Sequence, residues 1–310
     1  MTGDPREPQT PSGDGIFLDH VGWFVPDMAV AEAAFARLGL PMSPYTVHTN
    51  EQPDGTRIPS GTANRCAMLK RGYLEVLTAV DGVDTALSRQ LLGGIARYTG
   101  LHLIALTVAD ADAATERLRA SGFAPQPPVS LRRAMPLDAG GEGTAAFSVI
   151  RLPADAMEEG RIQILTQDAP DVVWQPSVTA SANALDMLSG ILVCTADPDE
   201  AAARYARFAG RPAVEGRDGI RRIALDRGAI AICGEDACRA ALAGIGIPDL
   251  PFMAAVAIRS ADMAATRAFL AARGVSLLAD ERGRIVVDPR EMAGAALVVH
   301  EAARDPFSAA

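Results

Sequence analysis

Cysteine is scarce in this sequence, and long apolar runs and basic clusters are missing. The four cysteines among 310 residues are too few and too scattered for a disulfide framework. Cys233 and Cys238 lie close together, but neither a second pair nor a nearby histidine accompanies them, so we do not expect zinc there. The longest apolar runs fall short of the roughly 18 residues that a membrane span needs, so we expect no membrane contact.

The net negative charge of the chain argues against a nucleic-acid partner. The chain has 29 Lys and Arg against 38 Asp and Glu, a net charge of −9. Because no basic patch is dense enough to follow a phosphate backbone, we expect no nucleic-acid partner. Residues 1–15 are polar and rich in proline and glycine, without the apolar core of a signal peptide. We therefore predict a disordered tail over 1–15 and a cytoplasmic protein, either a monomer or a homodimer.

A repeated pattern dominates the rest of the chain, which at 310 residues corresponds to about two domains. Four segments begin with an apolar strand and continue into an amphipathic helix that an aspartate precedes. The strands are 17–25, 101–108, 189–195 and 253–259, and the aspartates are Asp27, Asp110, Asp197 and Asp262. Aspartate is a preferred residue at a helix N-terminus because its carboxylate accepts hydrogen bonds from the free N–H groups.

Each of the four segments closes with strands, and a glycine precedes the last one. These glycines are Gly72, Gly160, Gly228 and Gly294. The pattern predicts an α+β fold of four βαβββ modules in two paired halves. We predict an N-terminal domain over 16–168, a linker over 169–186 and a degenerate C-terminal domain over 187–303.

Polar residues recur at matched positions of the first two modules. His20 and His102 fall in the first strands, and Glu75 and Gln163 fall in the last strands. Imidazole, carboxylate and amide oxygen suit divalent first-row metals, so these four residues are the candidate ligands. The corresponding positions of the other two modules hold no comparable ligands; they are near Ser189 and Ala254, and at Ala231 and Leu297. A metal site would thus belong to the N-terminal half.

Further residues of the first module are candidates for contacting a substrate. Asn64 and Arg65 alternate along one strand, so one of the two should face the site. Trp23 and Tyr73 are expected either to line the pocket or to pack in the core. His48, beside a flexible segment at 50–55, is expected to face solvent.

Three stretches resemble the glyoxalase-like domain of the vicinal oxygen chelate superfamily. They are Leu18–Asp27 (LDHVGWFVPD), Gly61–Arg65 (GTANR) and Gly72–Glu75 (GYLE). The resemblance implies paired βαβββ modules around a divalent metal, with His20, Glu75 and His102 as ligands. Gln163 stands where the superfamily usually has a glutamate that moves a proton. Glu75 or a metal-bound hydroxide would have to take that role.

Three hypotheses follow from the residues and the resemblance. The first is a metal-dependent isomerase or lyase acting on a small oxygenated substrate, with Ni, Zn, Mn or Fe as cofactor and Glu75 as the catalytic group. The second is an extradiol-type ring-cleaving dioxygenase, since two histidines and one carboxylate suit Fe(II). The third is a metal-free small-molecule binding or resistance protein.

Overall fold

The computed structural model describes residues 8–51, 56–179 and 182–308, so part of the predicted tail, 1–7, lies outside the described residues. Its first elements are β1 (Ile16–Phe24), α1 (Met28–Arg37), β2 (Thr46–Glu51), β3 (Arg57–Met68) and β4 (Tyr73–Ala79). After α2 (Ala86–Arg97) the same order recurs in β5 (Gly100–Val108), α3 (Ala111–Ala120), β6 (Val129–Pro136), β7 (Glu142–Arg151) and β8 (Arg161–Gln167).

The second half of the chain repeats this order of elements. The predicted linker contains α4 (Pro170–Val173) and a short 3-10 turn, Pro176–Val178. Then follow β9 (Leu185–Cys194), α5 (Pro198–Ala209), β10 (Ala213–Glu215), β11 (Arg221–Ala224), β12 (Ala229–Cys233) and α6 (Glu235–Ala241). The last elements are β13 (Phe252–Ser260), α7 (Met263–Ala272), β14 (Leu277–Glu281), β15 (Arg284–Val287), a 3-10 turn Pro289–Glu291 and β16 (Ala296–His300). The predicted α+β class is confirmed.

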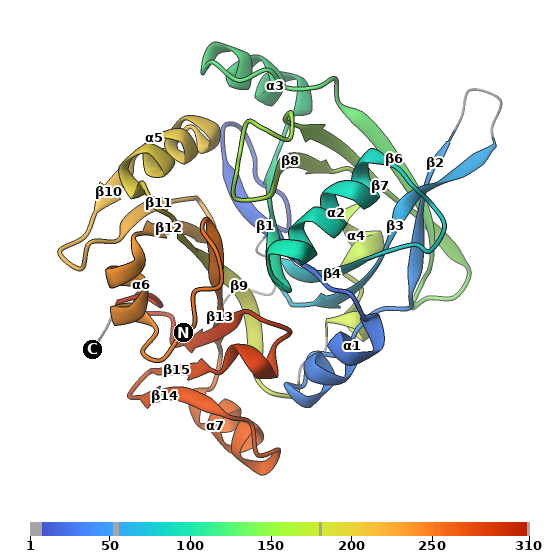
Figure 1. Cartoon of the computed structure of the whole chain (residues 1–310). Coiled ribbons are helices and arrows are strands. Elements are labelled where there is room, and N and C mark those ends of the chain that lie inside the picture. The colour runs from blue at the N-terminus through green and yellow to red at the C-terminus, as the bar shows by residue number, and fades with distance from the viewer. Residues whose placement is uncertain (1–7, 52–55, 180–181, 309–310) are drawn as a thin grey trace.

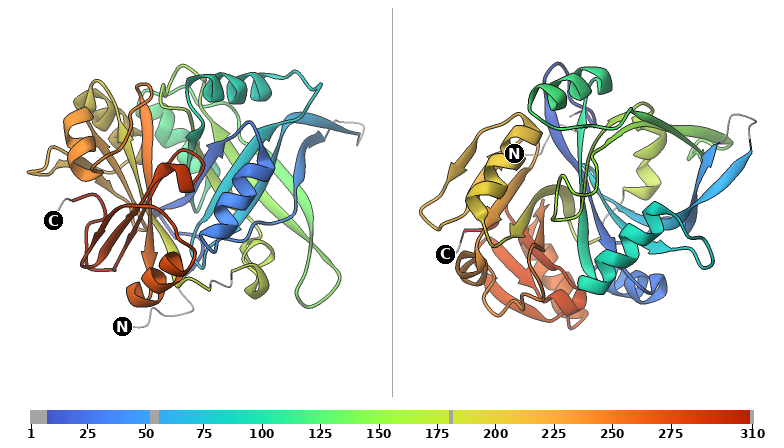
Figure 2. Two further views of the ribbon diagram at one scale, coloured as in Figure 1. Left: turned by 60° about the horizontal axis from the view of Figure 1, so that its bottom comes forward. Right: turned by 45° about the horizontal axis from the view of Figure 1, so that its top comes forward.

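The strands of each half pair around a central antiparallel couple. In the first half the hydrogen-bonded order is β6-β7-β8-β5-β1-β4-β3-β2, with β1 antiparallel to β5 and parallel to β4. The second half has the order β14-β15-β16-β13-β9-β12-β11-β10, and one pair, Met253 with Leu101, connects β13 to β5. The two halves lie side by side, with α1, α3, α5 and α7 at the periphery (Figures 1 and 2).

The predicted helix caps and glycine positions both have a structural cause. The four aspartates accept hydrogen bonds from backbone N–H groups two or three residues ahead. The four glycines have positive φ, between 73° and 154°. A Cβ at Gly72 would lie 2.9 Å from the carbonyl oxygen of Asp19, and one at Gly160 would overlap that of His102. At Gly72 and Gly160, glycine therefore lets the last strand approach the first strand of its module.

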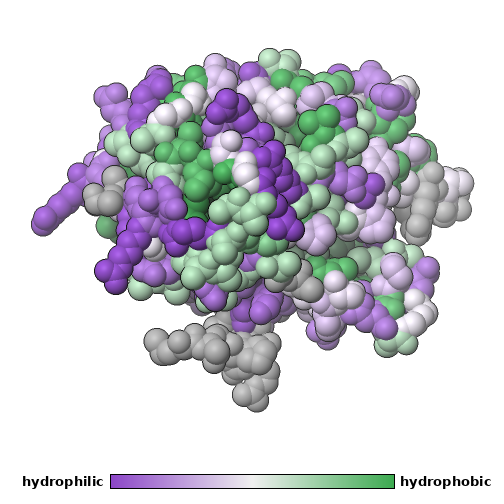
Figure 3. Space-filling view, turned by 90° about the horizontal axis from the view of Figure 1, so that it is seen from below, coloured by the Kyte–Doolittle hydropathy of each residue, from purple (hydrophilic) through white to green (hydrophobic). Residues whose placement is uncertain are grey.

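Apolar residues of both halves form one continuous core. Phe35 of α1 and Tyr205 and Phe208 of α5 belong to it, and Trp23 is completely buried within it. A second cluster occupies the other face of the first-half strands, where Phe24, Leu77 and Leu103 meet α2. On the face of the molecule shown in Figure 3, hydrophilic residues separate the apolar areas from one another. No helix among the described residues is long and apolar enough to cross a membrane.

Candidate functional site

His20 lies on β1 and is held by a chain of hydrogen bonds. Its Nδ1 is 2.7 Å from Oδ1 of Asp19, which is completely buried. The Gln167 side chain of β8 donates to both Asp19 oxygens at 3.2 and 3.1 Å. Because a carboxylate can only accept, Nδ1 carries the ring hydrogen and the lone pair of His20 is on Nε2. The Asp19 contact thus fixes both the tautomer and the orientation of the ring.

The carboxylate of Glu75 faces the free nitrogen of His20. Glu75 Oε2 lies 3.7 Å from His20 Nε2, and Glu75 Oε1 accepts a 2.5 Å hydrogen bond from Asn64 Nδ2. Burial raises the pKa of Glu75, but the neighbouring imidazoles of His20 and His48 and the Asn64 hydrogen bond lower it below its ordinary value. Tyr73 stacks on the His20 ring with 4.4 Å between ring centroids. The structure thus brings His20, Glu75, Asn64 and Tyr73 together.

His48 joins this group, against the expectation that it faces solvent. Its Nδ1 is 3.1 Å from Oγ1 of Thr62, and it interacts with Asn64 and Glu75. Burial lowers the pKa of His48, Glu75 opposes this shift, and Arg133 and Arg161 add to it. The ring is therefore neutral at pH 7. His48 lies on the short strand β2, and the pairing of β2 with β3 brings it beside Thr62 and Asn64. The sequence alone does not show this pairing.

A second residue that the sequence did not single out, Arg161, lies on β8 near the same group. Its guanidinium is 5.2 Å from the ring of Phe24, and its Nε donates to Gln90 Oε1 at 2.9 Å. Burial lowers the pKa of Arg161 to about 10, although Glu75 opposes this shift. Its Nη2 is buried and has no hydrogen-bond partner among the described residues. Arg161 thus leaves one cationic donor unpaired.

His102 lies apart from His20 and Glu75. Its ring stacks on Tyr98 and Phe24, with centroids 4.0 and 5.1 Å away, and its Nε2 is 2.8 Å from the backbone oxygen of Tyr98. Among the described residues, the one group of three His, Cys, Asp or Glu ligand atoms within 4.8 Å of one another does not include it. The structure therefore does not assemble His102 with the other predicted ligands.

The pairing of strands explains why His102 is displaced. His20 lies opposite Tyr73, two residues before Glu75, whereas the residue opposite Arg161, two before Gln163, is Leu103. Each of the two strands contains one extra residue at a β-bulge, Asp19 in β1 between Leu18 and His20, and His102 in β5 between Leu101 and Leu103. His102 is thus the counterpart of Asp19. Leu103 is therefore the counterpart of His20.

The remaining candidates take different positions. Gln163 is the ladder counterpart of Glu75 and is 8% exposed. Of the alternating pair, Asn64 faces Glu75, whereas Arg65 donates to the backbone oxygen of Ser43 and pairs with Glu32. Trp23 donates its indole N–H to the backbone oxygen of Met292 and packs in the core. Arg65 and Trp23 thus point away from the His20–Glu75 pair.

The family model described as a glyoxalase-like domain matches residues 18–209, more than half of the chain. The chain belongs to this glyoxalase-like family. A search of curated proteins found no match. Solved structures share the fold at identities too low to show more, and three of them illustrate this. One is a hypothetical protein from Staphylococcus aureus, with TM-score 0.64, 11% identity, and coverage of 92% of this chain and 99% of that one.

The other two similar structures are named as enzymes. A mutant of 4-hydroxymandelate synthase from Streptomyces coelicolor has TM-score 0.59 and 14% identity, and the match covers 94% of each chain. A fusion of a xylose isomerase-like TIM barrel with a 4-hydroxyphenylpyruvate dioxygenase has TM-score 0.57 and 14% identity, covering 98% of this chain and 52% of the fusion. The fold is thus that of the vicinal oxygen chelate superfamily, as the sequence resemblance predicted.

Proposed function

We propose that the N-terminal half is the active site of a metal-dependent enzyme that performs isomerase or lyase chemistry on a small oxygenated substrate. One observation carries the proposal: Nε2 of His20, oriented by Asp19, lies 3.7 Å from Oε2 of Glu75. Two ligand atoms of one ion lie about 3–4 Å apart, given bonds of about 2.1 Å. A carboxylate behind a histidine is also the usual support of a metal-binding imidazole.

The ligand set that fits is His20 and Glu75, with the amide oxygen of Gln163 as the third member from the opposite module. Leu103 stands at the counterpart of His20 and cannot bind a metal. With no more than three protein ligands, a divalent ion would keep positions open for two substrate oxygens and would act on them as a Lewis acid. We do not propose the ring-cleaving dioxygenase, because His102 does not join His20 and Glu75.

His48 is the proposed proton acceptor in place of Glu75. Gln163 cannot take a proton, and Glu75 has a lowered pKa and is engaged by Asn64. The neutral imidazole of His48 is close to Glu75 and Asn64, and a neutral imidazole can accept a proton at pH 7. Arg161 is the proposed partner of an anionic substrate oxygen, since its unpaired Nη2 can donate to a carboxylate or enolate.

The test is metal content after mild purification and reconstitution. We expect about one equivalent of metal in the native protein. The variants His20→Ala and Glu75→Gln should each lower metal affinity at least 10-fold, because losing even a residue that only supports a metal ligand costs roughly that much. His102→Phe is the matched control, because it keeps an aromatic ring between Phe24 and Tyr98 and removes only the imidazole. It should retain metal. Equal metal content in native and His20→Ala protein would refute the proposal.

A second candidate function, a metal-free binding protein, is favoured by Leu103 in the place of a second histidine ligand. In that case His20 and Glu75 would bind the polar part of a ligand by hydrogen bonds. Absence of stoichiometric metal after reconstitution with Ni, Zn, Mn and Fe(II), in a protein that still folds, would favour this candidate over the enzyme.

A further inference from the structure

Three of the four cysteines come together in the second half of the molecule. Cys194 ends β9 and pairs across the parallel ladder with Cys233, which ends β12. Cys238 lies in α6, which follows β12 directly. All three side chains are completely buried, and their Sγ atoms lie within 4.8 Å of one another. The fold thus joins Cys194 to the pair that looked incomplete in the sequence.

The chemistry of this cluster points to a soft cation. Thiolates favour soft metal ions such as Cu(I), whereas hard cations favour oxygen. Three sulfur atoms around one ion, with bonds of about 2.3 Å, lie about 4 Å apart, which agrees with the upper limit of 4.8 Å found here. No histidine or carboxylate among the described residues adds a fourth ligand to the group. A three-coordinate ion is therefore the occupant that fits.

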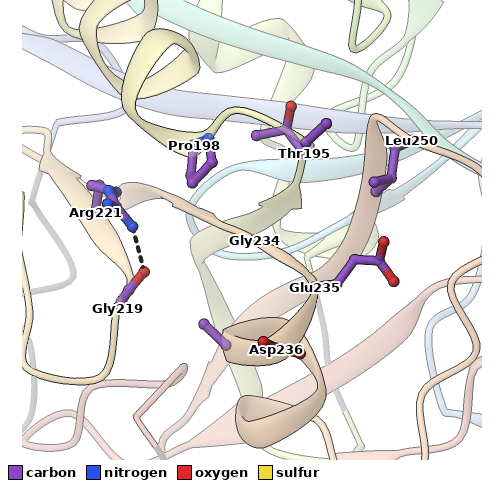
Figure 4. Close-up of a pocket in the computed structure, with 10 residues that line it drawn as sticks. Thr195, Pro198, Gly219, Arg221, Gly234, Glu235, Asp236 and Leu250 are labelled. Atoms are coloured by element: carbon purple, nitrogen blue, oxygen red, sulfur yellow. Dashed lines mark hydrogen bonds between the residues drawn. The ribbon is translucent and has the colours of Figure 1, made fainter.

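A surface pocket lies beside the cluster. A pocket of about 630 Å³ is lined by residues adjacent in sequence to each cysteine: Thr195 after Cys194, Gly234 after Cys233 and Ala237 before Cys238. Glu235 and Asp236 of α6 line the same pocket, and Figure 4 shows the Glu235 carboxylate near Leu250, with Arg221 on the opposite side. Glu235 and Asp236 place two carboxylates in this pocket, and the one cationic side chain among its described lining residues, Arg221, is already paired with Asp199 and Glu215. The local charge thus favours the approach of a cation.

We propose that Cys194, Cys233 and Cys238 form a site for one soft, thiophilic metal ion of the Cu(I) class. Binding forms sulfur–metal bonds and releases thiol hydrogens to the solvent as protons, without any change in oxidation state. Buried cysteines often act only as small apolar side chains. That role does not explain why three sulfur atoms come within 4.8 Å of one another beside a surface pocket. The site is independent of the His20–Glu75 pair, which lies in the other half.

The experiment titrates the reduced full-length protein with Cu(I) under anaerobic conditions, in competition with a chromogenic Cu(I) chelator. We expect one Cu(I) per chain, a sulfur-to-copper absorption band in the near ultraviolet, and a higher thermal unfolding midpoint. Cys238→Ala is the first variant, since alanine suits the helix α6. It should lower Cu(I) affinity at least about 100-fold, because a direct ligand is lost. Cys194→Ala should do the same.

Cys66→Ala and His20→Ala serve as matched controls. Cys66 is the fourth cysteine and lies outside the cluster, and His20 belongs to the proposed enzyme site. Both variants should keep the copper band and the rise in unfolding midpoint. Substoichiometric Cu(I), equal affinity in Cys238→Ala and native protein, or displacement of Cu(I) by an equal concentration of Zn(II) would each overturn the proposal. Circular dichroism of each variant separates loss of the site from loss of the fold.

Discussion

At the scale of single residues, His102 has the most restricted surroundings of the four histidines. It is 1% exposed and stacks on Phe24 and Tyr98, and burial lowers its pKa from 6.5 to about 4. As pH falls below about 6.5, the unfolded chain protonates this ring, whereas the folded chain does so only near pH 4. The stabilisation from the neutral ring is complete above pH 6.5 and is lost as pH falls toward 4, about 3 kcal/mol in all.

The variant His102→Phe should therefore reduce the acid sensitivity of the fold. Urea unfolding at pH 7 and pH 4.5 measures the free energy of unfolding of the native protein and the variant at both pH values. We expect the loss between the two pH values to be smaller in the variant by roughly 2–3 kcal/mol. An equal loss in both proteins would show that another group is responsible.

His48 governs a second prediction at this scale. Its pKa is lowered by burial, so the ring remains neutral below its ordinary range and can accept a proton. In the proposed enzyme, His48→Gln should lower kcat by about 100-fold or more, since general-base catalysis contributes about that much. The metal content should stay unchanged. A variant with native kcat, or one that loses its metal, would contradict the role of proton acceptor.

The distribution of site residues shows what a sequence can and cannot predict at this scale. Glu75 and Gln163 were matched correctly, because each follows its strand-starting glycine by three residues. His102 was matched to His20, but it is the counterpart of Asp19, because each of these two residues occupies the β-bulge of its strand. A bulge depends on contacts with the neighbouring strand, so no local pattern announced it.

At the scale of elements, the glycines that precede the last strands determine how closely strands pack. Gly294 has a φ of 96°, and a Cβ there would overlap the carbonyl oxygen of Thr99, which precedes β5. Gly122 has a φ of 86°, but a Cβ there would meet nothing within 4 Å. An added side chain would therefore be strained by the left-handed backbone at both positions, but only at Gly294 would it also collide with a neighbouring atom.

Gly294→Ala should therefore destabilise the fold far more than Gly122→Ala. We expect about 1–2 kcal/mol for Gly122→Ala, from the left-handed backbone alone, and more than about 4 kcal/mol for Gly294→Ala, because a backbone oxygen cannot move aside. Chemical denaturation of both variants provides the comparison. A similar loss of unfolding free energy in the two variants would mean that the backbone at Gly294 can move away from Thr99 without cost, which would contradict the prediction. The caps and glycines were predictable from sequence because both are local backbone requirements.

At the scale of the whole molecule, a buried ion pair connects the two halves. Arg204 of α5 donates two hydrogen bonds of 2.8 Å to Glu159, which is completely buried in the loop before β8. Arg204→Met would leave that carboxylate buried without its partner, which costs about 3–5 kcal/mol. Arg267→Met, which removes the exposed pair with Asp280, should cost at most about 1 kcal/mol. Thermal unfolding distinguishes the two, and equal effects would contradict a role in joining the halves.

The sequence did not predict how the two halves are arranged relative to each other. The apolar face of a helix indicates that it is buried, but not against which neighbour. The pairing of Met253 with Leu101, the Arg204–Glu159 contact and the meeting of three cysteines all join segments distant in sequence. The overall α+β architecture was predictable because it depends on periodicity and turn residues, which are local.

The hydrogen bonds from Gln167 to Asp19 have a consequence for natural variation in this family. Asp19 orients His20 from one module, while Gln167 at the end of β8 steadies Asp19 from the other. Gln167 supports His20 only through Asp19, so relatives that replace the acid at 19 should also be released from keeping an amide at 167. Correlated substitution of these two positions, across modules that pair through β1 and β5, would be the evolutionary trace of a site maintained jointly by both.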